Sequence, residues 1–297
     1  MVIYDTTFAT NRYGFKLGLF VTVDAHLRTI ILAQSLLLHE TKDDFVWAFN
    51  AFKKYFKIPP TVLFTDSDPA MAYAIKYVFP STRHLLCTYH LSKNIFTHFH
   101  TLLNDREGTW PKFIAKWWSI CLEHRQDSTA SFDHEWGELR LIALSRHGPQ
   151  SQPFKLAMDW LDGTLKARKE QWAARYTWGE CTYGCHSTQR IESLHSGIKV
   201  HMKPSSLLTA LHEYLHHWST QSHASQAIKS HNSARRNRLK DFRFPPSITG
   251  LQKLITPEAY DLITQQAQFT LLYNIHTTDS RGVFRLSRTS ASSSVTD

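Results

Sequence analysis

The chain has 297 residues, of which 42% are hydrophobic and 13% aromatic, enough for a real core in one large domain or two modest ones. It contains no apolar run of about 18 residues and no basic start followed by an apolar core, which excludes a membrane span and a signal peptide from our expectations. A formal net charge of +9 favours a polyanionic partner, and four cysteines fit a reducing compartment better than a disulfide scaffold. We therefore expect an intracellular protein.

The first third of the chain alternates between strand and helix patterns. The segments MVIYD, KLGLFVTVD and TIILAQSLLL predict three strands, and phenylalanines at helical spacing from Phe45 to Phe56 predict a helix. TVLF and RHLLC predict two further strands, with helices over 69–79 and from about 90 to 103. The order β-β-β-α-β-α-β-α predicts an α/β fold with a mixed sheet and helices around it.

Two acids stand two residues apart just after the fourth predicted strand, at Asp66 and Asp68. Asp68 precedes Pro69, which is a strong helix start because the carboxylate accepts from amides of the first turn. Asp66 has no such local role. A carboxylate at the C-terminal end of a strand, facing a helix start, is therefore a candidate functional group.

From 104 to 178 the patterns become almost wholly helical. Seven of the nine tryptophans fall in this region. We predict a helical subdomain whose tryptophans pack in a core of its own rather than stack on bases, since aromatic side chains dominate core burial.

After the loop WGECTYGC, the segment STQRIESLHSGIKVHM predicts a helix that ends before Pro204, and a second helix follows over about 206–219. Glu192 lies beside the apolar stripe of the first of these helices. It is not at capping-box spacing from Ser187 or Thr188, so a solvated surface glutamate and a functional one both remain open.

A third acid, Asp5, follows the apolar VIY of the first strand, where a turn aspartate is the plain alternative. Together, Asp5, Asp66 and Glu192 put acids on the first strand, after the fourth strand, and on a helix that returns after the helical region. Such a set can bind two divalent cations that act on a phosphodiester. Carboxylates suit the hard ions Mg²⁺ and Mn²⁺.

Three blocks, DTTFATNRYG, FTDSDPAMAYAIKYVFPSTRHLLCTYHLSKN and STQRIESLHSGIK, resemble those of Mutator-like element (MULE) transposases over roughly residues 1–222. The resemblance implies an RNase H-like fold with a helical insertion before the last catalytic helix. It makes Asp5, Asp66 and Glu192 the catalytic Asp-Asp-Glu triad and the ligands of a two-metal Mg²⁺ or Mn²⁺ site. The implied parts are 1–103 as the first part of the core, 104–178 as the insertion, 179–222 as the returning catalytic helix, and 223–297 as a basic extension with a disordered tail.

The implied function is a DDE-type DNA transposase core that hydrolyses and transfers phosphodiesters at element ends. Its partner is double-stranded DNA, with a homo-oligomer possible and a nuclear location in a eukaryote. The alternative is a domesticated, non-catalytic DNA-binding transcriptional regulator. An intact acid triad favours the enzyme, whereas the terminal zinc fingers of full-length members are absent, which weighs against autonomous activity. A plain RNase H-like nuclease shares the chemistry but does not need the insertion.

Three further groups of residues carry expectations from the sequence. The Cys-x-x-His pair Cys87 and His90, carried by the family, is expected at the edge of the active site. A zinc site that adds Cys181, Cys185 and His186 is disfavoured, because the family pattern requires no cysteines in that loop. The basic segment SARRNRLKDFRF is predicted to bind the DNA backbone, with a solvated linker as an equal alternative; its basic residues are Arg235, Arg236, Arg238, Lys240 and Arg243.

Overall fold

The computed structural model describes residues 1–24, 27–123, 131–145 and 151–235, together with Tyr260 and two strands near the C-terminus, β6 (Tyr273–Thr277) and β7 (Phe284–Arg288). The chain divides into two compact units, one made of residues 1–22 and 29–217 and the other of residues 23–28 and 218–297. None of the helices in the described ranges combines the length and the apolar character that a membrane crossing requires.

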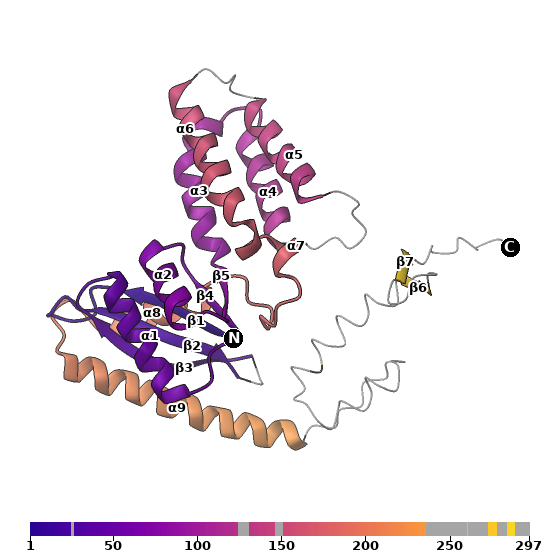
Figure 1. Ribbon diagram of the computed structural model, residues 1–297. Helices are drawn as coiled ribbons and strands as arrows, with labels where there is room; N and C mark the ends of the chain where they lie inside the picture. Colours follow the sequence, from indigo (N-terminus) through magenta and orange to yellow (C-terminus); the bar gives the residue numbers. More distant parts are fainter. Residues whose placement is uncertain are drawn as a thin grey trace. The chain divides into compact units, whose positions relative to one another are not determined.

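A five-stranded mixed sheet forms the centre of the first unit (Figure 1). Its strands run in the order β3-β2-β1-β4-β5, with β2 antiparallel to β1 and with β1, β4 and β5 mutually parallel. The predicted element order of the first third of the chain is confirmed. The strands are β1 (Val2–Thr7), β2 (Lys16–Val23), β3 (Thr29–Leu37), β4 (Val62–Thr65) and β5 (Arg83–Leu86).

Alternation along β1 separates the two faces of this sheet. Tyr4 is fully buried in an apolar cluster with side chains of α1 (Lys42–Phe56) and α2 (Pro69–Val78). Its neighbour Asp5 points to the opposite face, because successive strand side chains alternate, and there it meets α8 (Gln189–His201). The sheet thus has a hydrophobic face under α1 and α2 and a face that carries an acid under α8.

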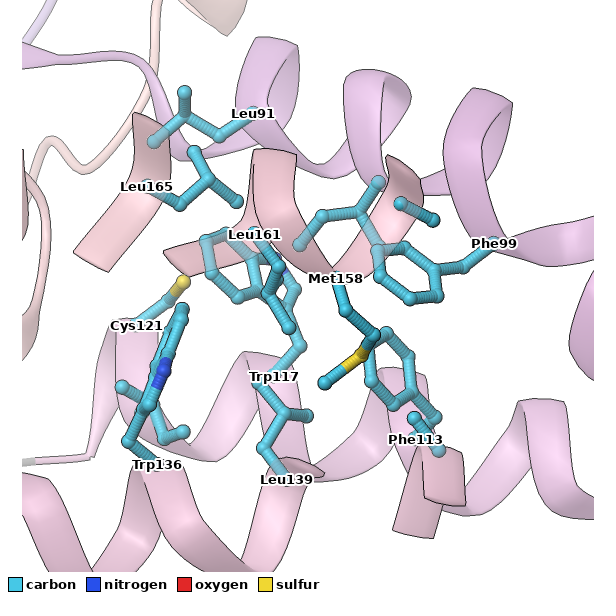
Figure 2. Packing of buried hydrophobic residues seen from close by; sticks show 14 of the residues in the cluster. Leu91, Phe99, Phe113, Trp117, Cys121, Trp136, Leu139, Met158, Leu161 and Leu165 are labelled. Atoms are coloured by element: carbon cyan, nitrogen blue, oxygen red, sulfur yellow. The ribbon is translucent and has the colours of Figure 1, made fainter. Parts of the chain in front are cut away.

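Residues between the sheet and α8 fold as helices, as predicted, and within the described part of 104–178 there is no strand. Trp117, Trp136 and Trp172 are buried in one cluster, which Figure 2 shows in part. Trp178 is the exception to the predicted packing, since it is 50% exposed. The elements are α4 (Thr109–Leu122), α5 (Phe132–Leu144), α6 (Gln152–Trp160), the π-helical turn η1 (Leu161–Leu165), the 3₁₀ helix η2 (Lys166–Gln171) and α7 (Ala174–Thr177).

One helix joins this helical cluster to the sheet. Helix α3 (Thr88–Leu103) begins directly after β5, and its apolar face, including Leu91 and Phe99, lies in the tryptophan cluster. The sheet therefore positions the start of α3, and the helical subdomain positions the rest of the helix. Both contacts give the residues in the first turn of α3 a defined position.

Two predictions near the C-terminus are wrong. The helix expected to end near residue 219 is α9 (Leu208–Arg235), which continues because no glycine or proline interrupts the chain between Pro204 and Pro245. The first four residues of the tail predicted to be disordered, 285–288, lie in β7, which pairs with β6 in an antiparallel manner, and residues 289–297 lie outside the described residues. The alternation in FRLSR carries the strand signal that its serine-rich surroundings obscure.

Candidate functional site

The first two acids are brought together by the register of two parallel strands. Ile3 on β1 pairs with Phe64 on β4. Asp5 and Asp66 each stand two residues further along, so both come out on the same face and at the same end of the sheet. Because neighbouring strands are about 4.8 Å apart, their carboxylates start from adjacent positions. Asp5 is buried, with 7% of its surface exposed.

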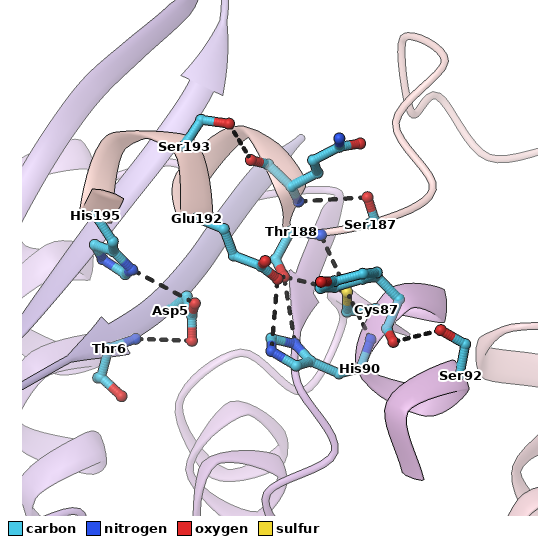
Figure 3. A network of polar contacts seen from close by, with 12 residues as sticks. Asp5, Thr6, Cys87, His90, Ser92, Ser187, Thr188, Glu192, Ser193 and His195 are labelled. Atoms are coloured by element: carbon cyan, nitrogen blue, oxygen red, sulfur yellow. Dashed lines mark hydrogen bonds and ion pairs between the residues drawn. The ribbon is translucent and has the colours of Figure 1, made fainter. Parts of the chain in front are cut away.

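Helix α8 is positioned by the loop that precedes it. The backbone N–H and the hydroxyl of Thr88, at the start of α3, donate to the carbonyl oxygen of His186, at 3.3 and 2.8 Å. Two residues later Thr188 begins α8, and Glu192 follows one turn further on. These bonds hold the start of α8 against the start of α3. Figure 3 shows Glu192 and His195 of α8 near Asp5.

The third acid, Glu192, lies in the same cluster. The charges of Asp66 and Glu192 both act on Asp5. The pKa of Asp5 is raised to about 7, chiefly by burial and also by the charges of Asp66 and Glu192, while His90 and the Thr6 N–H act in the opposite direction. Burial also raises the pKa of Asp66. Asp66 and Glu192 therefore both lie close enough to Asp5 for their charges to act on it, and a bound cation would relieve that repulsion.

Cys87 and His90 lie beside Glu192. The Cys87 thiol caps α3 by accepting from the N–H of His90 at 3.4 Å, and it also accepts from the N–H of Thr188 at 3.2 Å. Burial raises the pKa of this thiol, but the hydrogen bonds from His90 and Thr188 outweigh it and lower the pKa overall. The contact with Cys87, helped by Asp5 and Glu192, raises the pKa of His90 to about 9 despite burial. At neutral pH His90 is thus a cation between a thiol and the acids.

The side chain of Thr188 connects these groups. Its hydroxyl lies 3.1 Å from Cys87 Sγ and 3.1 Å from Glu192 Oε1, so its one proton is shared between two acceptors. Glu192 Oε1 is also 3.5 Å from His90 Nε2. Glu192 is therefore held by two side chains while about a quarter of its side chain stays exposed.

A soft-metal arrangement is present at the same place. The ligand atoms of Cys87, His90 and Glu192 all lie within 4.8 Å of one another, so this group could hold a metal ion, and Asp5 and Asp66 are not part of it. Cys181, Cys185 and His186 are not part of this group. A metal ion bound to the Cys87 thiolate would therefore compete with Asp5 and Asp66 for Glu192 as a ligand.

Two other predicted groups have separate positions. Asp68 caps α2, as predicted, by accepting from the N–H of Met71 at 2.8 Å. In the basic segment, Arg235 is the last residue of α9. The other four basic residues lie outside the described residues; they are Arg236, Arg238, Lys240 and Arg243.

His195 is a site residue that the sequence interpretation did not select. Its Nδ1 lies 3.7 Å from Asp5 Oδ2, and its Nε2 is buried without a hydrogen-bond partner among the described residues. Burial lowers the pKa of His195 to about 4, so the ring is neutral at neutral pH and its contact with Asp5 is not an ion pair. Its position three residues after Glu192, on the same helix face, was the available signal.

A mixed sheet with two acids at its parallel strand ends, covered by a helix that carries a third, defines an α/β protein with a buried acidic site. Residues 1–94 match the MULE transposase domain, so this part of the chain is similar to that family. The match contains Asp5, Asp66, Cys87 and His90, and it ends before Glu192.

Three relatives from Arabidopsis thaliana extend the comparison. The chain is 31% identical to Protein FAR1-RELATED SEQUENCE 5, over 46% of this chain and 18% of the relative. It is 24% identical to Protein FAR-RED IMPAIRED RESPONSE 1, over 66% of this chain and 22% of the relative. It is 27% identical to Protein FAR1-RELATED SEQUENCE 4, over 72% of this chain and 27% of the relative. The chain therefore corresponds to about a fifth to a quarter of the length of these relatives.

Proposed function

We propose that this chain is the core of a DNA-binding protein of transposase descent, with an RNase H-like fold in which Asp5, Asp66 and Glu192 bind divalent cations. The strand order β3-β2-β1-β4-β5, with β2 antiparallel, supports this fold assignment. The observation that carries the proposed site is the strand register that aligns Asp5 with Asp66, next to the helix that carries Glu192. The net charge of +9 supports DNA as the partner.

The donor set fits a hard cation. Three carboxylates offer oxygen ligands, which Mg²⁺ and Mn²⁺ prefer. The raised pKa of Asp5 reflects burial and nearby negative charge, both of which penalise the ionised carboxylate when no cation is present. Sharing a metal pair among these oxygens would remove that penalty, and the partial exposure of Glu192 leaves one side of the cluster accessible to a ligand.

In the catalytic candidate, this site cleaves and transfers phosphodiesters of double-stranded DNA. When bound, the cation pair activates the attacking oxygen and stabilises the leaving oxygen. Asp5 and Asp66 hold their positions through the strand register, and Thr188 orients Glu192. His90, protonated at neutral pH, offers a positive charge next to Glu192, where it can neutralise a phosphate oxygen.

The second candidate is a non-catalytic DNA-binding regulator that has kept the fold, acting in the nucleus of a eukaryotic host. The comparisons favour it over the enzyme, because relatives such as Protein FAR-RED IMPAIRED RESPONSE 1 are named for a response and not for DNA cleavage. Both candidates share DNA binding, and they differ in whether the acid cluster turns over a phosphodiester.

A nicking assay separates the two candidates. Wild type, Asp66→Asn and Asp68→Asn are incubated with a labelled duplex and Mg²⁺ or Mn²⁺, and binding to the same duplex is measured in parallel. Asp68→Asn is a matched control because asparagine caps a helix as well as aspartate does. The enzyme predicts nicking that Asp66→Asn abolishes and Asp68→Asn retains. Binding without nicking by the wild type favours the regulator, and absence of binding contradicts the proposal.

A further inference from the structure

Phe8 is an exposed aromatic residue close to the acidic cluster. It lies directly after β1, three residues beyond Asp5, and 63% of its surface is exposed. Two lysine amines lie over its ring, with Lys16 Nζ 5.4 Å and Lys199 Nζ 4.7 Å from the ring centroid. Single exposed aromatic residues are common on protein surfaces, so the two lysines at its ring are what distinguish Phe8.

The lysines come from the two elements that frame the site. Lys16 is the first residue of β2, and Lys199 lies on α8, seven residues after Glu192 and four after His195. Residues at these spacings share one helix face. β1 and α8 therefore contact each other twice, first between Asp5 and His195 and then, further along both elements, between Phe8 and Lys199.

Helix and strand geometry fix how far this contact lies from the acids. Three residues of a strand and seven residues of a helix each span about 10 Å. Phe8 is thus about one or two nucleotides along an extended strand from the position where a phosphate would meet the carboxylates. At this distance Phe8 can contact a base that neighbours the reacting phosphate, but it cannot contact that phosphate.

The arrangement has the chemistry of a single-strand binding platform. Within the described residues neither lysine amine is paired with a carboxylate, so both remain available to phosphate oxygens. An exposed ring can stack on any base, since every base has a π-face. The loop that follows Phe8 is braced by Asn11, whose side chain donates to the carbonyl of Phe15 at 2.8 Å and accepts from the N–H of Tyr13 at 3.1 Å. The platform is therefore largely pre-organised.

We propose that Phe8, Lys16 and Lys199 bind an unpaired nucleotide of a DNA strand, with its base stacked on Phe8 and its phosphates neutralised by the two lysines. The proposal rests on the proposed DNA binding and adds a preference for unpaired over paired DNA at the acidic site. Charge complementarity identifies the occupant: two unpaired cations flanking an aromatic ring match a phosphate-linked base and do not match a purely apolar partner surface.

The test compares three probes: an oligothymidine, a blunt duplex, and the same duplex with a single-stranded tail. Phe8→Ala should weaken binding to the oligothymidine and the tailed duplex by about 5- to 150-fold, the range expected for loss of one stacked base. Binding to the blunt duplex should change far less. Phe8→Leu keeps an apolar side chain without a π-face and should behave like Phe8→Ala, whereas Phe8→Trp should restore binding.

Tyr55 supplies a matched control. It is 78% exposed on α1 with Lys54 Nζ 6.0 Å from its ring, but α1 covers the face of the sheet opposite α8. Tyr55→Ala should leave binding to all three probes unchanged. Lys199→Gln should lower the salt dependence of oligothymidine binding by about 0.7 log units per log unit of salt, and Lys54→Gln should not.

Three outcomes would overturn the inference. The first is wild-type affinity of Phe8→Ala for all probes. The second is an equal loss of affinity of Phe8→Ala for the blunt duplex and the oligothymidine. The third is wild-type affinity of Phe8→Leu for the oligothymidine, which would mean that Phe8 acts only through packing. If the wild type binds none of the probes, the proposed DNA-binding function fails as well. Binding of DNA without dependence on Phe8 removes this inference alone.

Discussion

Asp5 on β1 and Asp66, the residue directly after β4, occupy equivalent positions two residues beyond the paired Ile3 and Phe64. The two carboxylates are far apart in the sequence but are aligned by backbone register, so neither depends on a flexible loop for its position. Glu192 reaches the same place from a helix whose start is hydrogen-bonded to α3. In the proposed cation site, two ligands are thus positioned by the sheet and the third by a helix.

The pH dependence of stability should report on Asp5. Its pKa is raised from 3.8 to about 7, so between these values the folded protein keeps a proton that the unfolded chain has lost. The free energy of unfolding therefore falls as pH rises through this window and levels off above it. Relative to Asp5→Asn, the wild type should lose up to about 4 kcal/mol across the window.

Urea denaturation of wild type and Asp5→Asn at several pH values measures this difference. Asp43→Asn, at an exposed position on α1, is the control and should follow the wild type. Addition of Mg²⁺ should stabilise the wild type more at the alkaline end than at the acid end, since the cation binds the ionised carboxylate. A difference between wild type and Asp5→Asn that does not vary with pH would show that Asp5 titrates normally.

Zinc should bind at the neighbouring group and compete for Glu192. The ligand atoms of Cys87, His90 and Glu192 lie within 4.8 Å of one another. Co²⁺, used as a spectroscopic substitute for Zn²⁺, should give a thiolate charge-transfer band that Cys87→Ser removes. Serine is a good helix cap, so this variant keeps the start of α3.

Cys185 is also buried and provides the control, because Cys185→Ser should leave the band unchanged. Excess Zn²⁺ should weaken Mn²⁺ binding in the wild type and have less effect in Cys87→Ser. Retention of the band in Cys87→Ser would exclude this thiol as the ligand.

The helical subdomain should depend strongly on its tryptophan core. Trp117 is fully buried and packs against Trp172, with ring centroids 4.6 Å apart. Trp117→Ala should lower the free energy of unfolding by about 3–5 kcal/mol, the usual cost of removing a large buried aromatic side chain. Leu141, 66% exposed on α5, is the control, and Leu141→Ala should change stability by about 0.5 kcal/mol or less. Equal effects of the two changes, measured by thermal and urea unfolding, would contradict the assigned core.

Local sequence patterns predicted most of the helices and strands but few of the contacts between segments that are far apart in the sequence. The alternation around Asp5 and the Asp68-Pro69 helix start depend on nearest neighbours, and both are present as predicted. The length of α9 was underestimated, because its sequence lacks a strong apolar stripe and offers no stop signal to fix its end. Sequence reasoning recognised a family motif in Cys87 and His90, but their hydrogen bonds to Thr188 join segments about a hundred residues apart, which no local pattern encodes.

The role of His195 could be predicted only in part for the same reason. Its spacing from Glu192 puts it on the right helix face, but its burial against Asp5 depends on how α8 packs on β1. Likewise, the exposed Phe8 follows the buried Val2, Ile3 and Tyr4, and only the tertiary structure shows which of these apolar residues faces outward.

Mn²⁺ binding followed by the loss of the free-ion electron paramagnetic resonance signal tests the central claim most directly. Asp5, Asp66 and Glu192 are proposed to hold the cation together, while Asp68 serves the helix. The account predicts that the wild type and Asp68→Asn bind Mn²⁺ alike, and that Asp66→Asn and Glu192→Gln each bind at least about 10-fold more weakly, since each removes a charged ligand. Equal Mn²⁺ affinity in wild type and Asp66→Asn, or no binding by the wild type, would contradict it.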